Sequence, residues 1–176
     1  METGRWAREM DVSALLIDSF LWKFRGEKKW TLKAIEQLTD EDIVWRPAPE
    51  SNSIANLAAH IWGTVHQRVE IVFFDVPDTR NRDKEFDKGI VMSKEEALEL
   101  IRKSFDILIN VLEDMKSKPE LLLHRPYVNM PPLTYSALNN QSTVLEIMMQ
   151  MVSHLPFHTG QIIYIAKMRL GKINWD

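Results

Sequence analysis

Apolar residues recur at helical spacing in four stretches of the chain. The first stretch runs from about Asp11 to Leu38, where Leu16, Phe20 and Phe24 follow one another at steps of four. The second begins near Ser53 and reaches residue 74. Its apolar stripe consists of Ile54, Leu57, Ile61, Val65, Val69 and Val72. Each stripe is typical of one buried face of an amphipathic helix.

The third and fourth stretches carry signals for helix ends as well as periodicity. Ser93 is followed three residues later by Glu96, and Thr143 by Glu146, which is the capping-box pattern of a helix N-terminus. We interpret Glu146 as a cap for this reason. The fourth stretch ends at Gly171, directly after a turn rich in cations, as helix C-termini commonly do.

The segments between these stretches read as loops, and none alternates apolar and polar residues as a strand would. They cover residues 45–52, 76–89 and 119–142, and the last is long enough to cover a pocket. The chain has 176 residues, a length that fits one domain. The pattern predicts an all-α protein, a four-helix bundle formed by a single domain over residues 1–176.

Composition excludes several classes of function. The net charge is −3 and the basic residues are scattered, so we expect no nucleic-acid partner. No apolar run approaches the roughly 20 residues of a membrane-spanning helix, and the N-terminus lacks a signal-type apolar block. A cytoplasmic location is the resulting expectation. The chain has no cysteine, which excludes disulfides, thiolate metal ligands and a cysteine nucleophile.

Two histidines on the fourth predicted helix are the first candidates for chemistry. His154 and His158 stand at positions i and i+4, a spacing that places both imidazoles on one helical face. There the two rings could bind the same metal ion, each at ~2.1 Å. Pro156 lies between them and predicts a kink, or even a restart of the helix, which would undo this spacing. The alternative is a pair of packed or solvated histidines without any metal.

The other histidines differ in where the helical pattern places them. His60 lies at the edge of the apolar stripe of the second helix and can point inward to meet the pair on the fourth helix. The alternative is a histidine satisfied at the core boundary. His66 lies about 120° away around the helix and is predicted to be exposed, with a surface contact to Glu70. His124 falls in the long loop and has no assignment.

Two segments together resemble a known family. They are SNSIANLAAHIWG, which contains His60, and VSHLPFHTGQIIYIAK, which contains His154 and His158 and continues as HTGQ. This order of motifs resembles the DinB/YfiT-like superfamily of small four-helix proteins, in which one histidine from the second helix joins an HxxxH pair on the last helix. The resemblance extends from the first helix to Lys167. Pro156 is not part of the family pattern.

The resemblance implies a divalent metal held by His60, His154 and His158, with zinc, nickel and iron all suited to imidazole ligands. Family members with known activities include transferases that use bacillithiol and a mycothiol-dependent isomerase. It therefore implies a small-molecule substrate and, as a possible cofactor, a low-molecular-weight thiol. The resemblance also implies a homodimer.

Several function classes stay open at this point. A metal-bound thiolate indicates a transferase, whereas a metal-bound hydroxide indicates a hydrolase. A metal-binding domain without catalysis and a bundle with incidental histidines are further alternatives. Gln161 is a candidate for orienting His158, and it could equally be an exposed polar residue. Asn56 and Gln150, each four residues before a candidate ligand, are interpreted as exposed polar residues.

Overall fold

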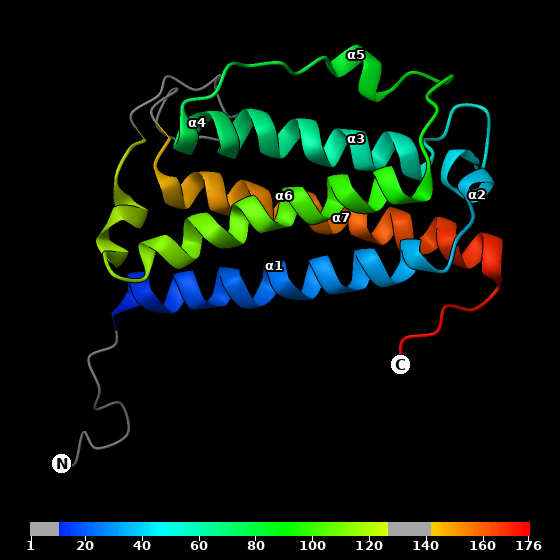
Figure 1. The fold of residues 1–176 in the computed structure, drawn as a ribbon. Coiled ribbons are helices and arrows are strands. Elements are labelled where there is room, and N and C mark those ends of the chain that lie inside the picture. Colours follow the sequence, from blue (N-terminus) through cyan, green and yellow to red (C-terminus); the bar gives the residue numbers. More distant parts are fainter. Residues whose placement is uncertain (1–10, 127–141) are drawn as a thin grey trace.

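The computed structural model describes residues 11–126 and 142–176, and in these ranges it is helical without any strand. Four long helices form an elongated bundle (Figure 1). They are α1 (Val12–Glu36), α3 (Ile54–Val65), α6 (Lys94–Met115) and α7 (Val144–Leu170). The predicted all-α four-helix bundle is therefore confirmed.

The helices of the bundle do not simply alternate in direction. Helices α1 and α7 run one way along the bundle, and α3 and α6 run the other way (Figure 1). Each of α1 and α3 packs against both α6 and α7. Because α3 and α6 run in the same direction, the connection between them must return along the bundle, whereas α6 and α7 run in opposite directions. Residues 127–141 of the connection from α6 to α7 lie outside the described ranges. The first connection contains the one-turn helix α5 (Arg82–Glu85), which lies beside α3.

The predicted helix starts are observed with their caps. The side chains of Ser53, Ser93 and Thr143 each accept a hydrogen bond from a backbone N–H in the first turn of α3, α6 and α7. Glu146 completes the capping box of α7, as its position in the sequence predicted. Such caps satisfy donors that have no partner within the helix and contribute about 1 kcal/mol each.

The predicted apolar stripes meet in one continuous core. Leu57 of α3, Phe24 of α1, Phe105 of α6 and Met151 of α7 are almost fully buried. Burial of a large apolar side chain contributes about 1.5–3 kcal/mol, so the four stripes supply the main driving force for the bundle. None of the described helices is long and apolar enough to cross a membrane.

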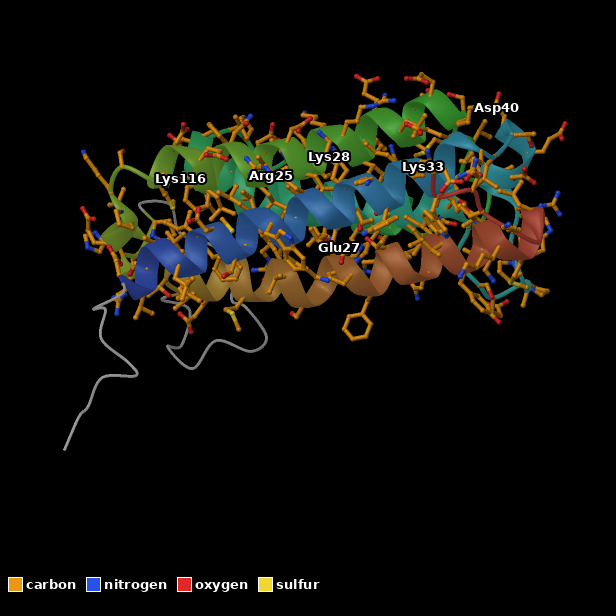
Figure 2. The ribbon with its side chains drawn as sticks, turned by 90° about the horizontal axis from the view of Figure 1, so that it is seen from below. Arg25, Glu27, Lys28, Lys33, Asp40 and Lys116 are labelled. Atoms are coloured by element: carbon orange, nitrogen blue, oxygen red, sulfur yellow. The ribbon has the colours of Figure 1, made fainter. Side chains whose placement is uncertain are left out.

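Ion pairs line the contact between α1 and α6. Lys28 Nζ lies 2.5 Å from Asp106 Oδ1, and Arg25 pairs with Glu113 (Figure 2). At the end of the bundle where α7 ends, the short helix α2 (Asp40–Val44) contacts α7 through Asp42, whose Oδ1 lies 2.5 Å from Arg169 Nε. A 3₁₀ turn, Pro119–Leu123, follows α6. The ion pairs are partly exposed, so they fix the orientation of the helices relative to one another more than they add to the stability of the fold.

The second predicted helix reaches residue 74 as expected, but it changes its winding. Helix α3 continues into a π-helical turn, His66–Glu70, and then α4, Ile71–Phe74. The predicted exposure of His66 is wrong, since this side chain is buried. The connection after α4 folds back over it, and the Thr79 N–H donates to His66 Nε2 at 3.2 Å. The predicted contact of His66 with Glu70 is present, at 2.5 Å, and is part-buried rather than on the surface.

Pro156 does not interrupt the last helix, so the predicted restart of the helix is wrong. Helix α7 is continuous from Val144 to Leu170 with this proline inside it. A proline removes one backbone hydrogen bond and costs about 3 kcal/mol in a helix interior. The neighbouring Leu155 is fully buried, and burial of α7 along its length outweighs this local cost. His154 and His158 therefore share one helical face.

Candidate metal centre

Three imidazoles from two antiparallel helices converge at one point. His154 Nε2 lies 3.2 Å from His60 Nε2 and 3.2 Å from His158 Nε2. One nitrogen from each of the three rings falls within 4.8 Å of the other two. His60 comes from α3, and the other two come from successive turns of α7. The structure thus brings together all three histidines that the sequence singled out.

The outer nitrogen of His60 is held by a carboxylate from a distant part of the chain. His60 Nδ1 lies 2.8 Å from Glu85 Oε2, and both side chains are buried. Burial acts to raise the pKa of Glu85, but hydrogen bonds from His60 and Arg80 outweigh it and lower that pKa below its ordinary value. An ionised carboxylate accepts a hydrogen bond from Nδ1–H, which leaves the lone pair of His60 Nε2 directed at the cluster.

Arg80 holds this carboxylate in place. Its Nε donates to Glu85 Oε1 at 2.7 Å and its Nη2 to Glu85 Oε2 at 3.0 Å, a bidentate pair. Its Nη1 donates to Gln67 Oε1 of the π-helical turn at 2.9 Å. The buried charge of Glu85 is therefore balanced, and the arginine is in turn attached to the helix that carries His60.

Two further residues of α3 make room for Glu85 and anchor its backbone. A Cβ atom at Gly63 would overlap Glu85 Oε1, so the carboxylate reaches His60 only because residue 63 has no side chain. Asn56 Nδ2 donates to the backbone oxygens of Glu85 and Asp87, each at 2.9 Å. The interpretation of Asn56 as an exposed polar residue is wrong, because its amide is fully buried and is used as an anchor.

The outer nitrogen of His158 also has a partner. His158 Nδ1 lies 2.8 Å from Gln161 Oε1, the arrangement expected when the amide oxygen accepts a hydrogen bond from Nδ1–H. Gln161 is itself exposed and lies one turn after the histidine that it orients. Two of the three rings therefore have a partner that directs Nε2 toward the cluster.

Burial and mutual proximity keep the two α7 histidines neutral. Desolvation, followed by the charges of His158, His60, Arg80 and Arg82, lowers the pKa of His154 from 6.5 to about 4. Desolvation is also the main cause that lowers the pKa of His158, partly offset by its hydrogen bond with Gln161. Neutral imidazoles with free lone pairs are the form that binds a cation.

This donor set fits a divalent transition metal. Nitrogens 3.2 Å apart match the spacing around an ion bound at ~2.1 Å per nitrogen. Among the described residues, no carboxylate or further histidine joins the cluster, so solvent or substrate can complete the coordination. Three neutral nitrogens suit zinc, nickel or iron, and the donor types do not select among them.

The surroundings of the cluster come from α5 and α7. The ring of Phe86 lies 4.9 Å from the ring of His60, and Arg82 Cζ lies 5.1 Å from the Phe86 ring. On the other side, Gln161 and Tyr164 of α7 line a hollow of about 390 Å³ together with the loop before α3. A small molecule can therefore lie next to Gln161, which contacts His158, without displacing the core.

Sequence reasoning missed the groups that support His60. Glu85 and Arg80 lie in the segment 76–89, which reads as a charged loop, and neither stands at a fixed helical spacing from a histidine. The glycine at position 63, three residues after His60, was the only available signal for a close approach. Gln150, predicted to be exposed, is half-buried.

Comparisons with known proteins agree with this architecture. A DinB-like protein from Bacillus cereus ATCC 10987 superposes with a TM-score of 0.58 at 18% sequence identity, covering 89% of this chain and 95% of that chain. A conserved protein from Enterococcus faecalis superposes with a TM-score of 0.57 at 17% identity, covering 93% of this chain and all of the other. No functionally curated protein matches the sequence.

The resemblance to DinB-like proteins is thus confirmed at the level of the fold. A family model described as a protein of unknown function, DUF1572, matches residues 11–176, which include all three clustered histidines. The chain therefore belongs to the DUF1572 family and has the DinB-like four-helix fold.

Proposed function

We propose that the protein is a divalent-metal-dependent transferase that activates a low-molecular-weight thiol of the bacillithiol type. The observation that carries the proposal is the convergence of three imidazole nitrogens, with the outer nitrogens of His60 and His158 held by Glu85 and Gln161. A divalent ion with neutral ligands favours an anionic ligand in its open position and lowers the pKa of a bound thiol. The chain has no cysteine, so the thiol must come from outside.

In this proposal, each residue at the cluster has its own role. His60, His154 and His158 bind the metal ion, and their Nε2 atoms must stay unprotonated to do so. Glu85 holds the Nδ1 proton of His60, and Gln161 holds that of His158, so that the rings cannot turn away. Phe86 shields one side of His60 from water.

The proposed reaction is a substitution at an electrophilic carbon. The thiol gives up its proton to solvent, its sulfur forms a bond to that carbon, and the bond from the carbon to the leaving group breaks. The leaving group departs with the electron pair. Within the proposal the protein is cytoplasmic, a setting in which small thiols are kept reduced.

Two other functions predict different behaviour from the same cluster. In a hydrolase, water would replace the thiol as the nucleophile, and esters or amides would be cleaved without thiol consumption. A non-catalytic metal-binding domain would bind the ion and turn over neither kind of substrate. Within residues 11–126 and 142–176, no carboxylate joins the clustered ligands, which favours the transferase, since a hydrolase gains from a nearby general base.

The test combines metal analysis with a thiol-transfer assay. Protein purified without a histidine tag is analysed for bound metal and then incubated with bacillithiol, glutathione or coenzyme A and the electrophile monochlorobimane. We expect metal-dependent conjugation of at least one thiol. We expect H60A, H154A and H158A to lose both metal and conjugation, whereas Q161A should keep the metal and react roughly 10–100-fold more slowly.

His124→Ala is the matched control, because this exposed histidine lies outside the cluster. It should retain metal and activity. Hydrolysis of an ester or amide without thiol consumption would replace the transferase by a hydrolase. Metal binding with no turnover of either kind would leave only the non-catalytic alternative.

We also propose that the protein forms a homodimer through the outer faces of α1 and α7. Trp22 is 78% exposed, and Phe157 and Tyr164 are 74% and 67% exposed. Trp22 and Trp30 flank a hollow of about 490 Å³ next to Gly26. Aromatic rings with exposed faces are typical of residues that a protein interface buries. A second copy of the chain is the occupant, because a two-fold axis buries the same face on both copies.

A further inference from the structure

We propose that Arg82, supported by Phe86, is a specificity-determining residue that selects substrates carrying a carboxylate or phosphate group. This inference rests on the proposed function, because it concerns the molecule that would occupy the open side of the three-histidine cluster. It adds a substrate class, anionic small molecules, and a residue that recognises it.

The one-turn helix α5 and its C-cap residue, Phe86, place three side chains on the same side. Arg82, Glu85 and Phe86 stand at positions i, i+3 and i+4, which share a helical face. Glu85 enters the protein and meets His60 Nδ1 at 2.8 Å. Phe86 packs its ring 4.9 Å from that of His60, and Arg82 Cζ lies 5.1 Å from the Phe86 ring. The guanidinium is thus stacked next to the cluster.

The position of Arg82 suits contact with a ligand bound at the cluster. The two spacings together place its guanidinium within about 10 Å of the His60 ring. A bound small molecule with its reactive atom at the cluster and its anionic group a few bonds away spans a distance of this order. The planar guanidinium offers paired donors that match a carboxylate or phosphate.

Arg82 differs from Arg80 in how its charge is used. Arg80 is half-buried, and its guanidinium is committed to Glu85 and Gln67. Arg82 is exposed, and within the described residues it makes no salt bridge, although it is held in place by a cation–π contact with Phe86. A preorganised cation with unused donors is what recognition of an anion requires.

The charge around the cluster favours the same class of ligand. Glu85 is the carboxylate in contact with His60, and Arg80 neutralises it. The three imidazoles contribute no negative charge when neutral. A bound dication together with Arg82 therefore leaves a net positive site, which attracts anions and disfavours cationic substrates.

The experiment measures ligand binding rather than turnover. Cobalt-loaded protein is titrated with two thiols, 3-mercaptopropionate and the uncharged 2-mercaptoethanol, and the thiolate absorption band gives each Kd. A parallel titration uses two hydroxamates, the monohydroxamate of succinic acid and the uncharged butyrohydroxamate, which bind metals without a thiol. The variants are R82A, R82K and, as a matched control, R102A, which removes a partly exposed arginine of α6 that is paired with Glu95.

We expect R82A to weaken binding of both anionic probes roughly tenfold, with the uncharged probes unchanged. R82K should weaken binding of the anionic probes less than R82A does, since lysine keeps the charge and loses the paired donors. R102A should bind all four probes as the wild type does. An unchanged ratio between charged and uncharged probes in R82A would overturn the inference. So would an equal loss for all four probes, because it would assign Arg82 a structural role.

The two pairs of probes separate this inference from the proposed function. If the hydroxamates show the dependence on Arg82 while neither thiol gives a thiolate band, selection of anions stands and the thiol transferase is rejected. If the protein binds no cobalt, the proposed function fails first, and the inference that rests on it fails as well.

Discussion

His60 and Glu85 are 25 residues apart in the chain, yet the His60 Nδ1 and Glu85 Oε2 atoms lie 2.8 Å apart in the interior. This pair connects a candidate ligand on α3 to the one-turn helix α5 of the following connection (Figure 1). The orientation of His60 therefore depends on a segment outside the four-helix core. Groups that hold a ligand's outer nitrogen commonly tune its affinity for metal.

The first prediction concerns this carboxylate. Glu85→Gln keeps the shape of the side chain and removes its charge, so His60 loses its anionic acceptor while Arg80 keeps an amide oxygen. We expect metal affinity to fall roughly 10–100-fold without complete loss. Competition with a chromogenic chelator measures it. Glu95→Gln, which changes an exposed carboxylate of α6, is the control. Equal affinities of E85Q and wild type would show that the pair has no role at the site.

A second prediction uses two glycines as a matched pair. Gly63→Ala places a methyl group where Glu85 Oε1 lies, so the carboxylate must move away from His60. We expect weaker metal binding, with a destabilisation of about 1–3 kcal/mol from overpacking. Gly26→Ala meets open space in α1 and should stabilise the helix by about 0.5–1 kcal/mol with metal affinity unchanged. Denaturant unfolding and a metal titration distinguish the two variants, and similar results for both would contradict the steric argument.

The third prediction is a dependence of stability on pH in the metal-free protein. The pKa of His154 falls from 6.5 to about 4 on folding, mainly through desolvation, so the unfolded chain binds more protons in this window. The free energy of unfolding should therefore be highest above pH 6.5 and decline as the pH falls toward 4. His158, whose pKa is also lowered, acts in the same direction.

Urea unfolding of metal-free protein across this pH range measures the effect. H154N should show a flatter profile, because asparagine does not titrate, while H124N should follow wild type. Parallel profiles for H154N and wild type would contradict the assignment of this pH dependence to His154.

A fourth prediction concerns removal of the metal. The core consists of apolar side chains from all four helices, so metal-free protein should still unfold cooperatively. An ion at 100 times its Kd stabilises the folded state by about 2.7 kcal/mol, which corresponds to a Tm increase of roughly 5–10 °C for a chain of this size. Calorimetry before and after EDTA treatment tests this. A Tm that does not respond to added zinc or nickel would argue against a metal bound by the folded protein.

The fifth prediction tests self-association. Trp22→Arg places a charge on the exposed face of α1 and should shift the proposed dimer to monomer in light scattering. Val91→Arg changes a residue that is 92% exposed in a different part of the surface and should leave the assembly unchanged. Wild-type protein that is monomeric over a wide range of concentrations would remove the proposed interface.

The helices and the pairing of His154 with His158 were predictable because they rest on local information. Apolar spacing near 3.6 residues marks the buried face of each helix, and Ser53, Ser93 and Thr143 mark helix starts through contacts within one turn. The i, i+4 relation of the two histidines follows from the same geometry once α7 is known to continue through Pro156.

The features that the sequence did not predict arise where distant segments of the chain meet. The sequence by itself determined four amphipathic helices, their caps, and the placement of His154 and His158 on one helical face, with His60 of another helix able to meet them. Only the tertiary structure decided that Glu85 and Arg80 support His60, that Thr79 covers His66, and that α7 tolerates its proline. The physical reason is that periodicity records which face of a helix is buried, whereas the path of a connection is decided by the long-range packing and charge pairing of the whole fold.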